Sequence, residues 1–308
     1  MKHTYLFLLL FSCAGCSGQQ NNSAKAEHTE DSPTFRMISI PSILTEPAER
    51  ADYLVKHYWD NFDFSDTAYI HLPAVTEQAL ADYIDIMPHV SLQTASASIR
   101  EMLEKTKVEA RMFAHFTALY EKYLYDPNSP MRNDELYIPV LQTLLASQTI
   151  SEVDKIRPAH QLEIALKNRV GEKAIDFTYT LANGQTSTLY RVASDYTLLF
   201  FYNPDCNNCK EVAQQLQASS VTDRLIKEKR LKILAIYPDE DLQAWKEHLP
   251  DIPQDWINSY DDGSRLKEEE VYDLKAIPTL YLLDKEKKVL LKDATFDLLE
   301  YFLQQSTD

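Results

Sequence analysis

The stretch TLLFFYNPDCNNCK at residues 197–210 decides the fold prediction. Residues 197–202 form a continuous apolar run, which is typical of a central parallel strand buried on both faces of its sheet. A helix is predicted to follow at about residues 206–218. The sequence therefore predicts a buried strand, a short loop that carries a Cys-x-x-Cys motif, and a helix.

The position of the two cysteines predicts their chemistry. At the N-terminus of a helix, unpaired backbone N–H groups and the helix dipole stabilise negative charge, which favours a thiolate. Cys206 lies at this point and is the expected nucleophile. Cys209 lies three residues further on the same helical face, close enough to form a disulfide with Cys206 or to resolve a mixed disulfide.

Residues 171–308 alternate strand and helix patterns, which predicts an α/β domain around a mixed sheet. Asn183-Gly184 is a strong hairpin signal between apolar stretches at residues 177–180 and 186–190. Further strands are expected at residues 231–237, 279–283 and 289–291, and further helices at 242–249, 268–274 and 296–304.

A second motif, Ala276-Ile277-Pro278-Thr279, precedes a predicted strand. Proline cannot donate to a sheet ladder, so a strand that begins there is edge-like or has special geometry. With both motifs in this order, residues 171–305 resemble the thioredoxin superfamily, most closely the membrane-anchored TlpA-like thiol–disulfide oxidoreductases. The resemblance implies an α/β thioredoxin-like fold without organic cofactor or metal. It also implies that Cys206 is the attacking thiol, Cys209 the resolving thiol and Pro278 a cis-proline that flanks their disulfide.

Several positions depart from the familiar pattern of this superfamily. Asp205 replaces the tryptophan that often precedes the first cysteine, and its carboxylate disfavours a neighbouring thiolate, which Lys210 could partly offset. Phe200 stands where many thioredoxins bury an acid that assists proton transfer. Another group must then move the proton, and Asp239, Glu240 or water are the candidates.

The first half of the chain reads as helical. Amphipathic patterns recur at residues 75–86, 94–105, 108–125 and 133–146, with no strand pattern of useful length. We expect a separate all-α domain at residues 41–148 and a connecting helix at 149–170. This half resembles an uncharacterised helical domain that precedes thioredoxin-like domains in Gram-negative envelope lipoproteins. It either docks a partner near Cys206 or spaces the site from the membrane, and docking is favoured because a tether already provides spacing.

The N-terminus predicts export and a lipid anchor. A basic residue and an apolar run at residues 5–11 lead into Cys13 and Cys16, which resembles a bacterial lipobox over residues 1–16. Cys13 is the favoured lipidation site and Cys16 the alternative; an ordinary cleaved signal peptide is the rival interpretation. Residues 17–40 then form a polar tether. The expected location is the cell envelope of a Gram-negative bacterium, facing the periplasm, where a disulfide can form.

Composition narrows the function classes. Lys and Arg number 31 and Asp and Glu 47 in 308 residues, and 31 − 47 gives −16, so a nucleic-acid partner is not expected. Only five glycines occur, and no Gly-rich phosphate loop is present. After lipobox processing only Cys206 and Cys209 would serve the folded domains, too few for a typical structural zinc site.

Two functional interpretations remain. The first is a thiol–disulfide oxidoreductase whose partners are disulfide- or thiol-containing envelope proteins, with a membrane electron donor if it runs as a reductase. The second is a non-catalytic binding lipoprotein with the same fold and a structural disulfide. The Asn207-Asn208 pair between the cysteines does not report a potential, so the direction of electron flow is open.

Overall fold

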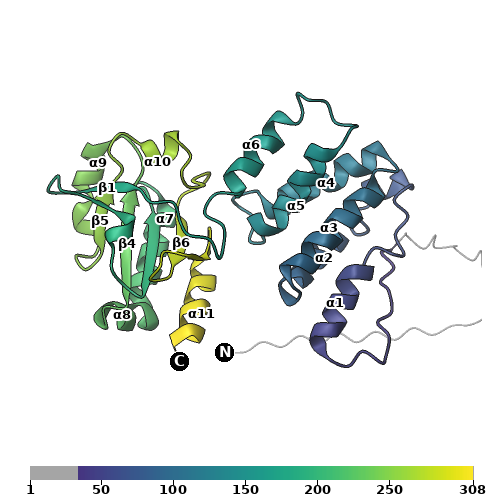
Figure 1. Cartoon of the computed structure of the whole chain (residues 1–308), viewed down its shortest axis with the longest axis horizontal. Coiled ribbons are helices and arrows are strands. Elements are labelled where there is room, and N and C mark those ends of the chain that lie inside the picture. Colours follow the sequence, from purple (N-terminus) through teal and green to yellow (C-terminus); the bar gives the residue numbers. More distant parts are fainter. Residues whose placement is uncertain (1–33, 308) are drawn as a thin grey trace, which may run out of the picture. The chain divides into compact units, whose positions relative to one another are not determined.

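The computed structural model describes residues 34–307, and residues 34–165, here called the helical half, contain only helices (Figure 1). These helices form because apolar side chains recur on one face of each, as in α4. The all-helical prediction for this part of the chain is confirmed. Its elements are α1 (Pro47–His57), η1 (Thr67–His71), α2 (Glu77–Ile86), η2 (Met87–His89), α3 (Leu92–Thr106), α4 (Ala110–Leu124), α5 (Asp134–Ala146) and α6 (Ile156–Ala165).

The core of the helical half is rich in aromatic rings. Trp59 is 3% exposed and meets the rings of Tyr83 and Phe116 edge-on, with centroids 5.5 and 5.4 Å away. Phe35, which lies in the predicted polar tether, stacks on Tyr58 at 5.0 Å. These side chains belong to one cluster of buried residues or pack against it, so the helical half has its own hydrophobic core. Full burial of one such large apolar side chain stabilises a fold by about 1.5–3 kcal/mol.

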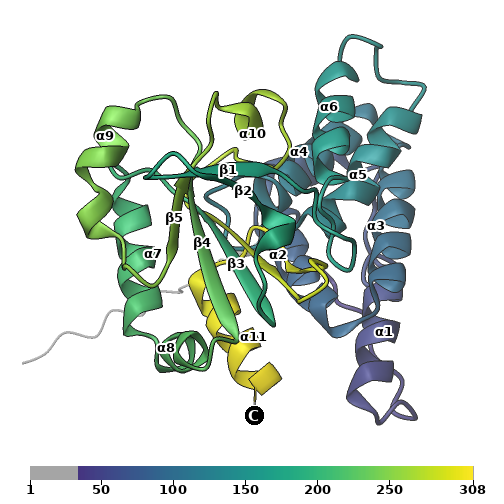
Figure 2. The ribbon, with the colours of Figure 1, turned by 60° about the vertical axis from the view of Figure 1, so that its left-hand side comes forward.

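The C-terminal part forms a seven-stranded mixed sheet in the order β2-β1-β5-β4-β3-β6-β7 (Figure 2). Strands β3, β4 and β5 are parallel neighbours, and β6 pairs antiparallel with β3. The elements are β1 (Thr178–Leu181), β2 (Thr186–Thr188), η3 (Leu189–Arg191), β3 (Tyr196–Phe201), α7 (Asn207–Ala218), α8 (Ser220–Lys227), β4 (Leu231–Tyr237), α9 (Leu242–Glu247), η4 (Leu249–Asp251), β5 (Ile257–Tyr260), α10 (Arg265–Glu268), β6 (Thr279–Leu283), β7 (Val289–Leu291) and α11 (Phe296–Thr307).

Both faces of the central strands are buried, as the apolar run at residues 197–202 predicted. Leu198 and Phe200 belong to the core on the face that α7, α8 and α11 cover. Leu199 and Phe201 belong to the core on the opposite face, with Phe177 and other residues before β3. Alternation of side chains along a strand produces these two cores. The predicted α/β thioredoxin-like fold is confirmed.

The structure differs from the predicted elements at three places. Two elements, α8 and β5, were not predicted. For α8 the reason is Ser219, which ends α7 and also caps α8, its Oγ accepting from the N–H of Thr222. No glycine or proline therefore marks the boundary between the two helices. The prediction of a helix at residues 268–274 is wrong, because α10 ends at Glu268 and the backbone of Glu270 takes a left-handed φ of 48°.

Candidate functional site

Cys206 occupies the junction between β3 and α7. It is the N-cap residue of α7, and its Sγ accepts a hydrogen bond from the backbone N–H of Cys209 at 3.1 Å. The same sulfur donates to the carbonyl oxygen of Ile277 at 3.5 Å. Its side chain is only partly buried, so a reagent or partner can reach it. The helix N-terminus thus supplies an N–H group to the one sulfur of the pair that is accessible.

Cys209 lies in a different environment. It is 2% exposed and belongs to the core beneath α7. Burial raises the pKa of the Cys209 thiol well above its usual range, the hydrogen bond with Cys206 raises it further, and a hydrogen bond from the Asn203 backbone opposes both effects. Cys209 is therefore a protonated, protected thiol directly behind an accessible one.

The loop before β6 completes the site. The Ile277–Pro278 peptide bond is cis, and the carbonyl of Ile277 faces Cys206. Thr279 Oγ1 donates to the carbonyl of Ala276 at 2.6 Å, which fixes the end of this loop at the start of β6. Pro278 thus stands beside the loop between β3 and α7 (residues 202–206), here called the cysteine loop, although about seventy positions separate the two in the chain.

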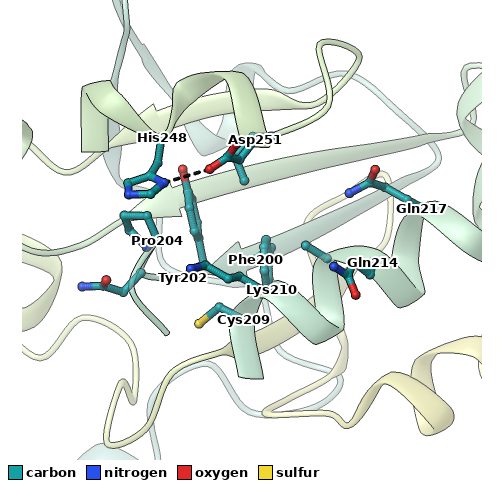
Figure 3. Close-up of a pocket in the computed structure, with 12 residues that line it drawn as sticks. Phe200, Tyr202, Pro204, Cys209, Lys210, Gln214, Gln217, His248 and Asp251 are labelled. Atoms are coloured by element: carbon teal, nitrogen blue, oxygen red, sulfur yellow. Dashed lines mark hydrogen bonds and ion pairs between the residues drawn. The ribbon is translucent and has the colours of Figure 1, made fainter. Parts of the chain in front are cut away.

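Two hollows border the cysteine loop. The first, of about 350 Å³, is lined by Cys209, Phe200, Tyr202, Lys210 and His248, among others (Figure 3). The second, of about 380 Å³, is bordered by α7 residues, by the loop around Pro278 and by residues of the helical half. These last are Pro127, Asn128 and Arg132. Residues of both halves of the chain therefore line the surroundings of the site.

The chain resembles known proteins in both halves. Residues 14–168 match the family described as a domain of unknown function (DUF5106), and residues 194–289 match the family described as thioredoxin-like. A crystal structure of a thioredoxin-like protein from Bacteroides caccae ATCC 43185 is 53% identical, with a TM-score of 0.85 over 89% of this chain and 99% of that one. The chain belongs to the thioredoxin-like family.

Other similar structures match a little under half of this chain. The C-terminal domain of an uncharacterized protein from Bacteroides fragilis NCTC 9343 is 51% identical over 44% of this chain and 98% of that one, with a TM-score of 0.44. A domain of a possible thiol-disulfide isomerase from Cytophaga hutchinsonii ATCC 33406 is 24% identical over 46% of this chain and 95% of that one, with a TM-score of 0.39. No curated protein matches the sequence.

The three residues predicted to tune this thioredoxin-like site are all exposed. Asp205 is exposed, and its carboxylate lies 4.0 Å from His248 Nε2. Lys210 is exposed at the rim of the first hollow. Glu240 is exposed, and no described contact joins it to either cysteine.

Asp239, the other predicted proton carrier, is engaged elsewhere. It accepts from Asn203 Nδ2 and from Lys267 Nζ, both at 2.8 Å. Burial alone would raise the pKa of Asp239, but these hydrogen bonds outweigh it and lower that pKa below 3.8. Asp239 is therefore an ionised group that holds the Asn203 side chain in the loop before Cys206.

His248 also lies at the site, although no sequence pattern predicted it there. Its Nδ1 hydrogen-bonds Asp251 at 2.8 Å, and the two side chains lie together on the wall of the first hollow (Figure 3). No local motif marks His248, because it lies between α9 and η4, about forty residues after Cys206, and reaches the first hollow only in the folded chain. Phe200 is fully buried and stacks on Tyr202 at 5.3 Å, so an apolar contact occupies the place of the missing acid.

The remaining predictions fall partly outside this structure. Cys13 and Cys16 lie outside the described residues. In the part of the chain that is described, no helix is long and apolar enough to cross a membrane. Across residues 34–307, no three His, Cys, Asp or Glu side chains come together as a metal-binding group.

Proposed function

We propose that this protein is a thiol–disulfide oxidoreductase that exchanges disulfides with partner proteins through Cys206 and Cys209. The observation that carries the proposal is the asymmetry of the two thiols at one helix N-terminus. The accessible Cys206 sulfur accepts the N–H of Cys209 at 3.1 Å, while Cys209 is buried and its pKa is raised. A purely structural disulfide requires no such difference between its two ends.

The proposed reaction has two steps. The Cys206 thiolate attacks one sulfur of the partner disulfide, forms a mixed disulfide and releases one partner thiol, which takes a proton from solvent. Cys209 then loses its proton and attacks the Cys206 sulfur, which releases the second partner thiol. The products are a Cys206–Cys209 disulfide and a reduced partner, with two electrons transferred to the partner. The reverse sequence oxidises a dithiol.

The buried state of Cys209 protects the mixed disulfide from premature resolution. Its proton must leave through the first hollow or along the cysteine loop, since Phe200 provides no acid beneath it. The first hollow, which His248 also lines, is the route that we propose for this proton.

The experiment that tests the function combines a redox titration with trapping. The full-length protein is equilibrated in glutathione buffers, and Cys209→Ser is compared with Cys206→Ser. Reversible reduction of the wild-type pair, with mixed disulfides trapped by Cys209→Ser alone, is the expected result. If the pair is reduced only when the protein unfolds, the enzyme interpretation is wrong and the bond is structural.

The location proposed for this reaction is the periplasmic side of the cell envelope, with the protein held by a lipid on Cys13 or Cys16. The lipobox-like sequence supports this proposal. Mass spectrometry of the N-terminal peptide, in wild-type protein and in Cys13→Ala and Cys16→Ala variants, identifies the modified cysteine. An N-terminal peptide without lipid would contradict the anchor.

A further inference from the structure

The start of α5 places a carboxylate among buried charges beside the cysteine loop. Asp134, in the first turn of α5, lies 2.9 Å from Lys292 Nζ and 3.8 Å from Lys275 Nζ. Lys275 Nζ also lies 2.6 Å from Asp273 and 4.6 Å from the centre of the Tyr125 ring. The side chains of Asp134, Lys275, Lys292 and Asp273, here called the Asp134 cluster, are only 5–16% exposed.

A second ion pair from the helical half binds the neighbouring loop. Arg132 Nε donates to Asp293 Oδ2 at 2.7 Å, and Arg132 Nη2 donates to the Asp293 carbonyl at 3.2 Å. The next residue, Ala294, donates its N–H to the carbonyl of Leu280 in β6. Asp134 thus contacts Lys275 in the loop that continues into β6, and Arg132 contacts the loop at Asp293, whose next residue is hydrogen-bonded to β6.

The Asp134 cluster lies two residues along the chain from the carbonyl that contacts the Cys206 sulfur. Lys275 precedes Ile277 by two residues, and the Ile277 carbonyl accepts the hydrogen bond from Cys206. A buried charge is costly unless opposite charge lies near it. Lys275 donates its hydrogen bond to Asp273 at 2.6 Å, and Asp134, at 3.8 Å, attracts the same ammonium by charge from α5. The loop at residues 275–278 is consequently held from the helical half, and its carbonyl is held at Cys206.

We propose that Asp134 is a positioning residue for Cys206, and that the helical half serves to fix the loop at residues 275–278 against the cysteine pair. The inference deepens the proposed oxidoreductase function, on which it rests. Without the Asp134 carboxylate, Lys275 keeps its hydrogen bond to Asp273 but loses its ion pair with α5. The Ile277 carbonyl then takes several positions, and the interaction of Cys206 with that loop is averaged over them.

The test substitutes Asp134→Asn in the full-length protein and measures two properties of Cys206. One is its alkylation rate with iodoacetamide, followed peptide by peptide with mass spectrometry so that Cys13 and Cys16 do not interfere. The other is the thiol–disulfide equilibrium constant against glutathione. We expect a change of about tenfold in the rate, since small misplacements at reactive centres have effects of this order or larger, and a shift in the equilibrium constant.

Glu135 provides the matched control. It occupies the same turn of α5 and pairs with Arg169 at 2.5 Å, with side chains 15% and 30% exposed, but it does not contact the loop at residues 275–278. Glu135→Gln should lower stability and leave both properties of Cys206 at wild-type values. Asp134→Glu should restore part of the wild-type behaviour, which a loss of stability alone does not predict.

The outcomes separate the inference from the proposed function. Should Asp134→Asn fold poorly, Arg132→Gln breaks the second ion pair and is measured in the same way. Wild-type values in the folded Asp134→Asn and Arg132→Gln proteins, or equal shifts in Glu135→Gln, overturn the inference. Iodoacetamide requires no partner disulfide, so the comparison stands even if the wild-type pair proves unable to exchange disulfides, a result that contradicts only the proposed function.

Discussion

Removing the buried ammonium of Lys292 tests how strongly the two halves of the chain are joined. Lys292 is 5% exposed along its side chain, and Nζ lies 2.9 Å from Asp134, 3.0 Å from the Ala165 carbonyl and 2.8 Å from the Lys167 carbonyl. Lys292→Met keeps the apolar stem, removes the cation beside the Asp134 carboxylate and leaves both carbonyls without this donor. Breaking a buried ion pair by removing one partner costs about 3–5 kcal/mol. We expect a loss in this range, because Lys275, the other cation near Asp134, already donates to Asp273 at 2.6 Å and so does not replace Lys292.

The assay is urea denaturation of wild type and variant at pH 7, followed by tryptophan fluorescence and far-UV circular dichroism. Trp59 reports on the helical half, and Trp245 and Trp256 report on the sheet. The control, Lys227→Met, removes an exposed partner of Asp223 in α8 and should cost roughly 0–1 kcal/mol. A loss below about 1 kcal/mol in Lys292→Met would refute the reasoning, because a cost that small is typical of an exposed pair.

Two further predictions concern single titratable groups. In the reduced protein at pH 8, iodoacetamide should label Cys206 at least about 100-fold faster than Cys209. Cys209 is buried and its pKa is raised, and each unit by which a thiol pKa exceeds the ambient pH reduces the thiolate fraction tenfold. Equal labelling of the two cysteines in peptide mass spectra would contradict the burial of Cys209. Lys287 is 4% exposed, and burial lowers its pKa below 10.5, so the charged form costs stability. That cost is complete below the folded-state pKa and disappears as the pH rises toward the unfolded value of 10.5. Lys287→Met also removes the hydrogen bond from Nζ to Thr197 Oγ1 at 2.7 Å, at either pH. The free energy of unfolding of Lys287→Met minus that of wild type should therefore be more positive at pH 7 than at pH 10, and a difference independent of pH would contradict this.

The parts of the fold that the sequence predicts are those whose signal is local. β3 is buried on both faces, so its residues are continuously apolar and stand out in the chain. α8 lacks such a signal at its start, because Ser219 both ends α7 and caps α8 without a helix-breaking residue. β5 is four residues long and largely half-buried, which leaves neither an apolar run nor a clear alternation.

The site divides in the same way. The spacing of Cys206 and Cys209 and the helix after them are local features, and so the N-cap position follows from the sequence. His248 reaches the first hollow from another element, and Arg132 meets Asp293 across 161 residues of chain. Charged residues of this kind are frequent on any protein surface, so only the folded structure shows that these ones are paired and partly buried.

The chemical type of the contacts between the helical half and the C-terminal part indicates what the helical half does. At the loops beside Cys206 these contacts are partly buried ion pairs, from Arg132 to Asp293 and from Asp134 to Lys275 and Lys292. Apolar surfaces of similar size would stabilise at least as well, but they tolerate sliding, whereas a buried charge is stable only where its partner stands. Such ion pairs therefore fix the position of the loop more than they raise the free energy of unfolding. A loop that must present one carbonyl to a reactive sulfur needs a defined position, and this agrees with a helical half that acts on Cys206 through the loop at residues 275–278.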